Sequence, residues 1–307
     1  MHFPVSGVDC PIWLPPAVSF VIATLVTPAG LSGAFVLLPF QMSVLGFLTP
    51  AVTPTNLIYN IVAIPGGVYQ YIRERRMVWP LTWAVMLGTL PGVFAGAFIR
   101  IRYLPDPRPC KLFVGLVLLY MGSRLLADVR SGKTPIENRF KTRLPAAAVV
   151  KTTFVSARRI EYEFWGEKFS FSPAAVLILA LLVGVAGGIY GVGGGAIIAP
   201  YVVAMLHLPA YTIAGAALLG TFLTSIAGVT FFELLGRTSM SAGLAVQPDW
   251  ALGILFGIGG LAGSYCGARL QKYLPERSIK LFLGLVVVVL GAAFVIQFFL
   301  PRSVAAL

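Results

Sequence analysis

The sequence contains little charge, few cysteines and almost no histidine, and each shortage argues against a class of protein. Only 11% of its 307 residues are charged and 58% are hydrophobic, whereas soluble domains carry about 25% charged residues. Its three cysteines form no CxxC pair, and its two histidines lack the spacing of a ligand set. We therefore expect no disulfide framework, no metal and no cofactor.

Acidic residues are scarce as well, so the formal net charge is +12. Ten of the 23 Lys and Arg residues fall between Arg124 and Lys168, and most others flank apolar segments. The positive-inside rule describes this distribution for membrane proteins, in which basic residues stay on the cytosolic side. We expect the lipid bilayer as a partner and no nucleic acid.

Two long tracts, 10–72 and 169–232, carry no charged residue at all. A helix that crosses a bilayer needs about 20 apolar residues, so each tract is long enough for several membrane elements. Disorder requires low hydrophobicity, which this chain does not have. The composition predicts an all-α, polytopic membrane protein.

The chain also repeats itself. Residues 30–39 (GLSGAFVLLP) match residues 191–200 (GVGGGAIIAP), and residues 111–115 (KLFVG) match residues 280–284 (KLFLG). Glycines at every fourth position add to the match: Gly88, Gly92 and Gly96 against Gly259, Gly263 and Gly267. We predict a first membrane repeat at 1–127, a basic cytosolic linker at 128–172 and a second membrane repeat at 173–307, a plan typical of secondary transporters.

Each half is expected to contain four elements. The first is a glycine-broken or re-entrant helix, at 16–46 and at 173–206, because glycines weaken a helix in mid-membrane. Three spanning helices follow in each half: 54–71, 78–99 and 108–126, then 209–235, 250–270 and 277–300. Within the linker, alternating residues on both sides of Trp165-Gly166-Glu167 predict a small β-hairpin.

The topology of the repeats depends on the first element of each half. If that element crosses the membrane, the halves are parallel, with 15 basic residues inside and 8 outside. If it dips in and returns, the repeats are inverted, with 17 inside and 6 outside. The second count favours inverted repeats, although the parallel arrangement stays open.

The candidate site lies at the two glycine clusters and in the polar stretches that follow them. A half-helix that starts at each cluster would present several N–H donors and about half an elementary positive charge, which suits a small anionic substrate. The predicted substrate-binding residues are Gly30, Ser32, Gly33, Thr53, Thr55, Asn56, Asn60, Gly191, Gly193, Gly194, Gly195, Thr221, Thr224 and Ser225. The alternatives are that the glycines only permit tight helix packing and that the hydroxyls bond their own backbone.

Ionisable side chains in the membrane region are rare, and two of them are candidates for proton coupling. Glu233 is the one carboxylate closely embedded in an apolar run, and intramembrane acids are often functional. The alternative is an interfacial residue beside Arg237. His207 has the same two interpretations, as a coupling residue or as the cap of an element.

The duplicated glycine motif with its trailing proline, together with the Lys-Leu-Phe element that begins each last helix, resembles the sulfite exporter TauE/SafE family. The resemblance implies a bacterial inner-membrane permease, mostly an exporter, for anions such as sulfite or an organosulfonate, and we expect alternating access. Ser32 and Ala34 depart from the family pattern, because they replace glycines of the second copy. Other functions left open are an anion channel, a membrane assembly factor and an intramembrane enzyme, and a homo-oligomer is also open.

Overall fold

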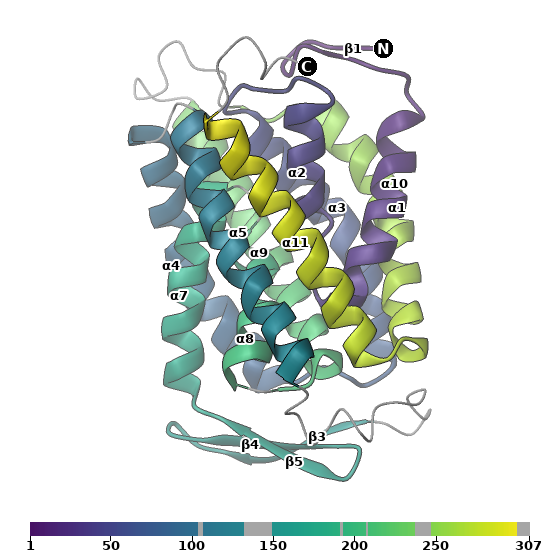
Figure 1. Ribbon diagram of the computed structural model, residues 1–307, viewed down its shortest axis with the longest axis vertical. Helices are drawn as coiled ribbons and strands as arrows, with labels where there is room; N and C mark the ends of the chain where they lie inside the picture. The colour runs from purple at the N-terminus through teal and green to yellow at the C-terminus, as the bar shows by residue number, and fades with distance from the viewer. Residues whose placement is uncertain (104–106, 132–148, 191–192, 207, 237–246, 300–307) are drawn as a thin grey trace.

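The computed structural model describes residues 1–103, 107–131, 149–190, 193–206, 208–236 and 247–299, and helices dominate them (Figure 1). The first half contains α1 (Leu14–Val26), the 3-10 turn η1 (Thr27–Ala29), α2 (Ala34–Ser43), α3 (Val52–Arg73), α4 (Trp79–Arg102) and α5 (Pro107–Ser131). The second half contains α7 (Pro173–Tyr190), η2 (Gly194–Ile197), α8 (Ile198–Leu206), α9 (Ala210–Gly236), α10 (Trp250–Leu270), η4 (Gln271–Tyr273) and α11 (Glu276–Phe299).

Three helices of the described residues are long and apolar enough to cross a membrane. They cover Trp79–Ile99, Ala210–Leu234 and Trp250–Tyr273, and they coincide with three of the six spanning helices expected from the sequence. Helices α3, α5 and α11 lie where the other three were expected and are 22, 25 and 24 residues long. The chain is therefore a mostly helical protein with the spans of a polytopic membrane protein.

Both glycine tracts interrupt a helix. After α1 and η1 the chain turns at Gly30, whose φ of 75° lies in the left-handed region that favours glycine. After α7 it passes Gly193, with a φ of 83°, before η2 and α8 begin. The predicted breaks are thus present in both halves.

Each broken element enters and leaves the bundle at the same end, and the two elements use opposite ends (Figure 1). Ser6, which precedes α1, and Thr55, which follows α2, both hydrogen-bond to Asp249, so the α1–α2 element starts and finishes at one end. Tyr162, which precedes α7, contacts Thr212, which follows α8, with 3.0 Å between their hydroxyl oxygens. The α7–α8 element therefore starts and finishes at the other end.

Helices of one half pack mainly against helices of the other half. Helix α1 lies along α10, α7 lies along α4, α3 contacts both α9 and α10, and α5 crosses α11. The glycines spaced by four line these contacts. A Cβ on Gly259 would meet Pro16 of α1, and a Cβ on Gly88 would meet Leu177 of α7. The absence of side chains lets the backbones approach closely, as in other small-residue helix contacts in membranes.

Gly259→Ala should destabilise the protein by forcing α1 away from α10. The added Cβ would lie 1.9 Å from the Pro16 carbonyl oxygen, and a backbone atom cannot move aside as a side chain can. Overpacking of this kind costs about 1–3 kcal/mol, which thermal unfolding of the purified protein would measure. Gly67→Ala on α3 is the control for loss of a helical glycine without a severe clash, since the atom nearest to its Cβ position is the flexible end of Leu218, at 3.3 Å. Equal stability of Gly259→Ala and wild type would contradict the close packing.

A three-stranded antiparallel sheet covers the end of the bundle at which α7 starts (Figure 1). It consists of β3 (Val150–Val155), β4 (Ile160–Phe164) and β5 (Glu167–Phe171). Strands β4 and β5 form the predicted hairpin, with positive φ at Trp165 and Gly166, a geometry typical of two-residue hairpin turns. The hairpin prediction is confirmed.

Other parts of the structure differ from the sequence-based expectation. Strand β3 was not predicted, and a short hairpin of β1 (His2–Phe3) and β2 (Val8–Asp9) adds further strand to a chain expected to be all helical elsewhere. Helix α5 continues to Ser131, inside the range assigned to the linker. Strands of two residues are too short to show a sequence periodicity, and the basic residues near the end of α5 resemble those of a linker.

Candidate functional site

Side chains from both halves meet at the break between α1 and α2. The Ser32 hydroxyl donates to Asn60 Oδ1 on α3, and Asn60 Nδ2 donates to Ser225 Oγ on α9 at 3.1 Å. All three side chains are buried. We call Ser32, Asn60 and Ser225 the central cluster.

The second glycine break reaches the same cluster. A Cβ on Gly193 would lie 3.0 Å from Thr221 Cγ2 and 3.1 Å from Ser225 Oγ. Gly195 lies equally close to Thr221, with its Cβ position 2.7 Å from Oγ1. The second break therefore faces α9 next to Ser225, the residue that Asn60 of α3 bonds.

The hydrogen bonds of the cluster determine what it can offer a ligand. Ser32 Oγ accepts the Ala34 N–H at 3.2 Å, so one donor at the start of α2 is already capped. Thr221 and Thr224 donate to the carbonyls of Ala217 and Gly220 one turn back, both at 2.8 Å, as is common for hydroxyls in membrane helices. The amide and hydroxyl groups of Asn60 and Ser225 are neutral, so they can bind an oxyanion only by donating hydrogen bonds.

Two more predicted residues lie beside the start of α2. Asn56, one turn before Asn60 on α3, donates to the Ala34 carbonyl at 3.0 Å. Gly30 fits against α9, with its Cβ position 2.8 Å from Ala214 Cα. Gly191 lies outside the described residues.

Thr55 and Thr53 are not brought to the central cluster by the contacts of α3. The Thr55 hydroxyl donates to the Ala51 carbonyl at 2.7 Å and accepts the Asp249 N–H at 2.8 Å. Asp249 in turn caps α10 through the Leu252 N–H. These bonds join the beginnings of α3 and α10, so Thr55 stabilises the helix contact at the end of the bundle. Thr53 is buried in the first turn of α3.

Two of the predicted glycines serve helix packing. The Cβ position of Gly194 lies 2.6 Å from Thr89 Cβ, and that of Gly33 lies 2.1 Å from the Tyr59 hydroxyl oxygen. A bulky side chain at either position would displace a neighbouring helix. Loss of transport in such a variant could therefore not be assigned to the site, and the polar side chains are better targets.

Glu233 lies near the end of α9 and away from the cluster. Its Oε1 accepts the Trp250 indole N–H at 3.1 Å, at the beginning of α10. This contact fits the interfacial interpretation of Glu233, while its role in proton coupling stays a prediction. His207 lies outside the described residues.

Comparison with known proteins identifies the family. The sequence profile described as "Sulfite exporter TauE/SafE" matches residues 16–294. The chain belongs to the TauE/SafE family. This TauE/SafE protein is 22% identical over 277 residues to "Probable membrane transporter protein YunE" of Bacillus subtilis, covering 87% of this chain and 91% of that protein.

A second Bacillus subtilis relative, "Probable membrane transporter protein YdhB", is 28% identical over 102 residues, or 33% of this chain and 37% of that protein. No solved structure matches the chain. The match confirms the resemblance seen in the sequence and makes this TauE/SafE protein a membrane transporter rather than an enzyme. Within the described ranges, no three His, Cys, Asp or Glu side chains are placed to hold a metal ion.

A buried arginine is linked to the first helix break of this TauE/SafE protein through Gln271. Arg76 is 2% exposed, pairs with Glu74, and donates to Gln271 Oε1 at 2.5 Å and to the Ala268 carbonyl at 3.2 Å. Gln271 Nε2 then donates to the Pro28 carbonyl at 2.7 Å. No local pattern in the sequence marks Arg76 as part of a network, because its partners on α10 and η4 lie almost 200 positions away.

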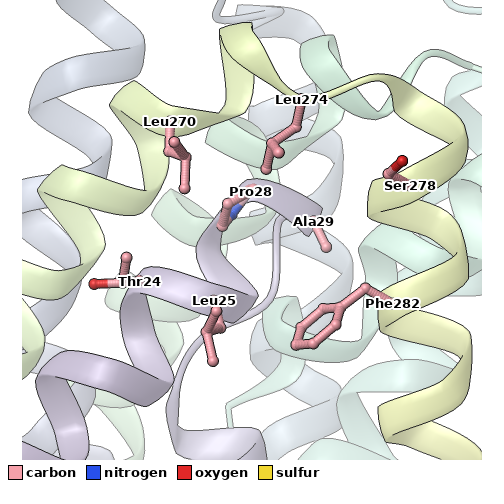
Figure 2. Close-up of a pocket in the computed structure, with 8 residues that line it drawn as sticks. All are labelled: Thr24, Leu25, Pro28, Ala29, Leu270, Leu274, Ser278 and Phe282. Carbon is pink, nitrogen blue, oxygen red and sulfur yellow. The ribbon is translucent and has the colours of Figure 1, made fainter.

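A cavity of about 260 Å³ adjoins the same break, between α1, α10 and α11 (Figure 2). Its walls are almost entirely apolar and are formed by Thr24, Leu25, Pro28, Ala29, Leu270, Leu274, Ser278 and Phe282. None of these is among the predicted substrate-binding residues. Thr24 directs its hydroxyl to the carbonyls of Phe20 and Gly263. A small anion would lose its hydration there without gaining donors, so the central cluster is the better candidate site.

Proposed function

We propose that this TauE/SafE protein is a secondary transporter for a small sulfur oxyanion, such as sulfite or an organosulfonate. One observation carries the proposal: Asn60 of the first half and Ser225 of the second are hydrogen-bonded at 3.1 Å, between two broken helices that enter from opposite ends. Substrate sites near the repeat interface, next to discontinuous helices, are the usual plan of secondary transporters.

The chemistry of the cluster suits an anion with several oxygen atoms. Asn60 and Ser225 provide N–H and O–H donors, and Gly193 allows close approach to the backbone because its side chain is a hydrogen atom. An oxyanion bound by neutral donors avoids the cost of a buried Arg or Lys, and it can leave again because no ion pair holds it. The sulfur in the proposed substrate comes from the family to which the chain belongs.

We propose that the halves are inverted repeats. The support is spatial: Gly259, Gly263 and Gly267 face α1 as Gly88, Gly92 and Gly96 face α7, and the two broken elements open toward opposite ends. In alternating access, the α1–α2 element would open the cluster to one side and the α7–α8 element to the other. Such a rocking of one unit against the other is common among transporters with inverted repeats.

We further propose that the end covered by the sheet faces the cytosol of a bacterial cell, with the segment 128–172 on that side. The Arg75 carbonyl accepts the Val150 N–H of β3 at 3.0 Å, so Arg75 and Arg73, the last residue of α3, lie near the basic residues of β3–β5, in agreement with the positive-inside rule. With this orientation, export would load the anion from the sheet side and release it at the end that carries β1 and β2.

Purified protein in liposomes tests the substrate class. We expect ligand-dependent thermal stabilisation by sulfite or an organosulfonate such as sulfoacetate, because a ligand that binds only the folded state raises its stability by mass action. The same anion should exchange across the liposome membrane, as measured with a radioactive label. Chloride and acetate are the controls for small anions without a sulfonyl group. A panel in which no sulfur anion stabilises the protein or crosses the membrane would contradict the proposal.

A further inference from the structure

Gln41 on α2 is a buried polar side chain without a task in the fold. Its relative exposure is 0%. Neither its amide nitrogen nor its amide oxygen has a hydrogen-bond partner within the described part of the chain. Buried amides almost always find partners, because leaving donors and acceptors unpaired costs stability.

The position of Gln41 relates it to the central cluster. Seven residues separate it from Ala34, which is two turns of helix, so both residues share one face of α2 about 10 Å apart. At Ala34 the N–H donates to Ser32 Oγ and the carbonyl accepts from Asn56. Gln41 therefore lies on the same face of α2 as Ala34, two turns away from the central cluster and closer to the end of the bundle where α3 starts.

The connection after α2 folds back beside Gln41. The Phe47 N–H donates to the Gln41 carbonyl at 2.9 Å. Two residues farther on, Thr49 Oγ1 is also a buried atom without a hydrogen-bond partner in the described chain. Two unpaired polar side chains thus belong to the segment that links the broken helix to the bundle end carrying β1 and β2.

We propose that Gln41 is a second binding residue for the transported anion, on the path between the central cluster and this end of the protein. The proposal rests on the function proposed above. The Gln41 amide N–H groups donate to the oxygens of the anion as it passes, while the apolar residues around them exclude water. No side chain or backbone group of the described residues pairs with the amide, so its burial lowers the stability of the folded protein while it serves transport.

Gln41→Leu separates this role from a structural one. Leucine replaces the amide side chain with an apolar one of similar size and so removes both unpaired groups. We therefore expect an unfolding midpoint equal to that of wild type or about 2–4 °C higher. Flux of the labelled sulfur anion in proteoliposomes should fall about tenfold or more at low anion concentration, because a hydrogen bond to a charged group is lost. A residue that serves only the fold would show the opposite pattern, with lower stability and normal flux per folded protein.

Gln41→Glu should reduce the flux further, since a carboxylate at the same place repels the anion. Met42→Leu is the matched control, as Met42 is the buried neighbour on α2 and the change is apolar for apolar. Normal flux in Gln41→Leu, or a midpoint lower than that of Met42→Leu, would overturn the proposal. A wild-type protein that moves no sulfur anion would instead contradict the proposed function itself, before any variant is compared.

Discussion

Asn60→Asp should abolish transport of the sulfur anion while the protein still folds. Aspartate has almost the shape of asparagine, so one of its oxygens can still accept from the Ser32 hydroxyl. Its other oxygen replaces the amide nitrogen that donates to Ser225, and the Ser225 hydroxyl has to turn and donate instead. The added negative charge, however, faces the anion. Two like charges about 4 Å apart repel by about 4 kcal/mol at an effective dielectric constant of 20, which corresponds to roughly a thousandfold loss of affinity.

The measurement is flux of the labelled anion in proteoliposomes, with the unfolding midpoint of each variant as the test of folding. Thr82→Val is a matched control, because it is also a nearly isosteric change of a buried polar residue. Among the described residues, the Thr82 hydroxyl bonds only the Val78 carbonyl of its own helix, α4. We expect wild-type flux in that control. Asn60→Asp with normal flux would remove the central cluster from the mechanism.

Arg76→Met should produce the largest loss of stability that we expect from one substitution. The change removes the buried one of the two cationic partners of Glu74 and leaves Gln271 Oε1 and the Ala268 carbonyl without their donor. Leaving a buried acceptor without its donor costs about 1–3 kcal/mol, and this change does so at two acceptors while it also weakens an ion pair. Thermal or denaturant unfolding in detergent would measure the loss.

Lys272→Met is the matched control for Arg76→Met. Lys272 also lies near Glu74, at 3.6 Å, but its side chain is 32% exposed, so its pairing is screened by solvent and contributes at most about 1 kcal/mol. A small effect in the control and a large one in Arg76→Met would assign the stability to the buried network. Equal effects of the two substitutions would mean that Arg76 is not the centre of that network.

The networks around Asp249 and Arg76 join the same helices. Asp249 joins Ser6, α3 and α10 at the end where α1 starts, whereas Arg76 and Gln271 join α3 and η4 to the break itself. Both therefore tie α10 to α3. We infer that α3 and α10 form one stable unit, to which the first broken element is tied at Ser6 and at Pro28.

Most of the membrane architecture could be predicted from the sequence, because it depends on properties that a short stretch of chain already has. Apolar runs of sufficient length predicted the spans, the glycine clusters near Gly30 and Gly193 predicted the helix breaks, and residue alternation around Gly166 predicted the hairpin. The duplicated glycine motif that resembles the TauE/SafE family is also a local pattern of residues, and the family profile matches the chain over residues 16–294.

Which polar residues meet was decided only by the tertiary structure. From the sequence, Thr55 and Asn60 are equivalent hydrogen-bonding residues on one helix, yet Thr55 bonds Asp249 at the bundle end and Asn60 bonds Ser225 at the centre. Gly193 and Gly194 are neighbours in the chain, but one faces the cluster and the other packs against Thr89. The physical reason is that these contacts join different helices, and their pairing depends on how the helices cross rather than on the composition of any one segment.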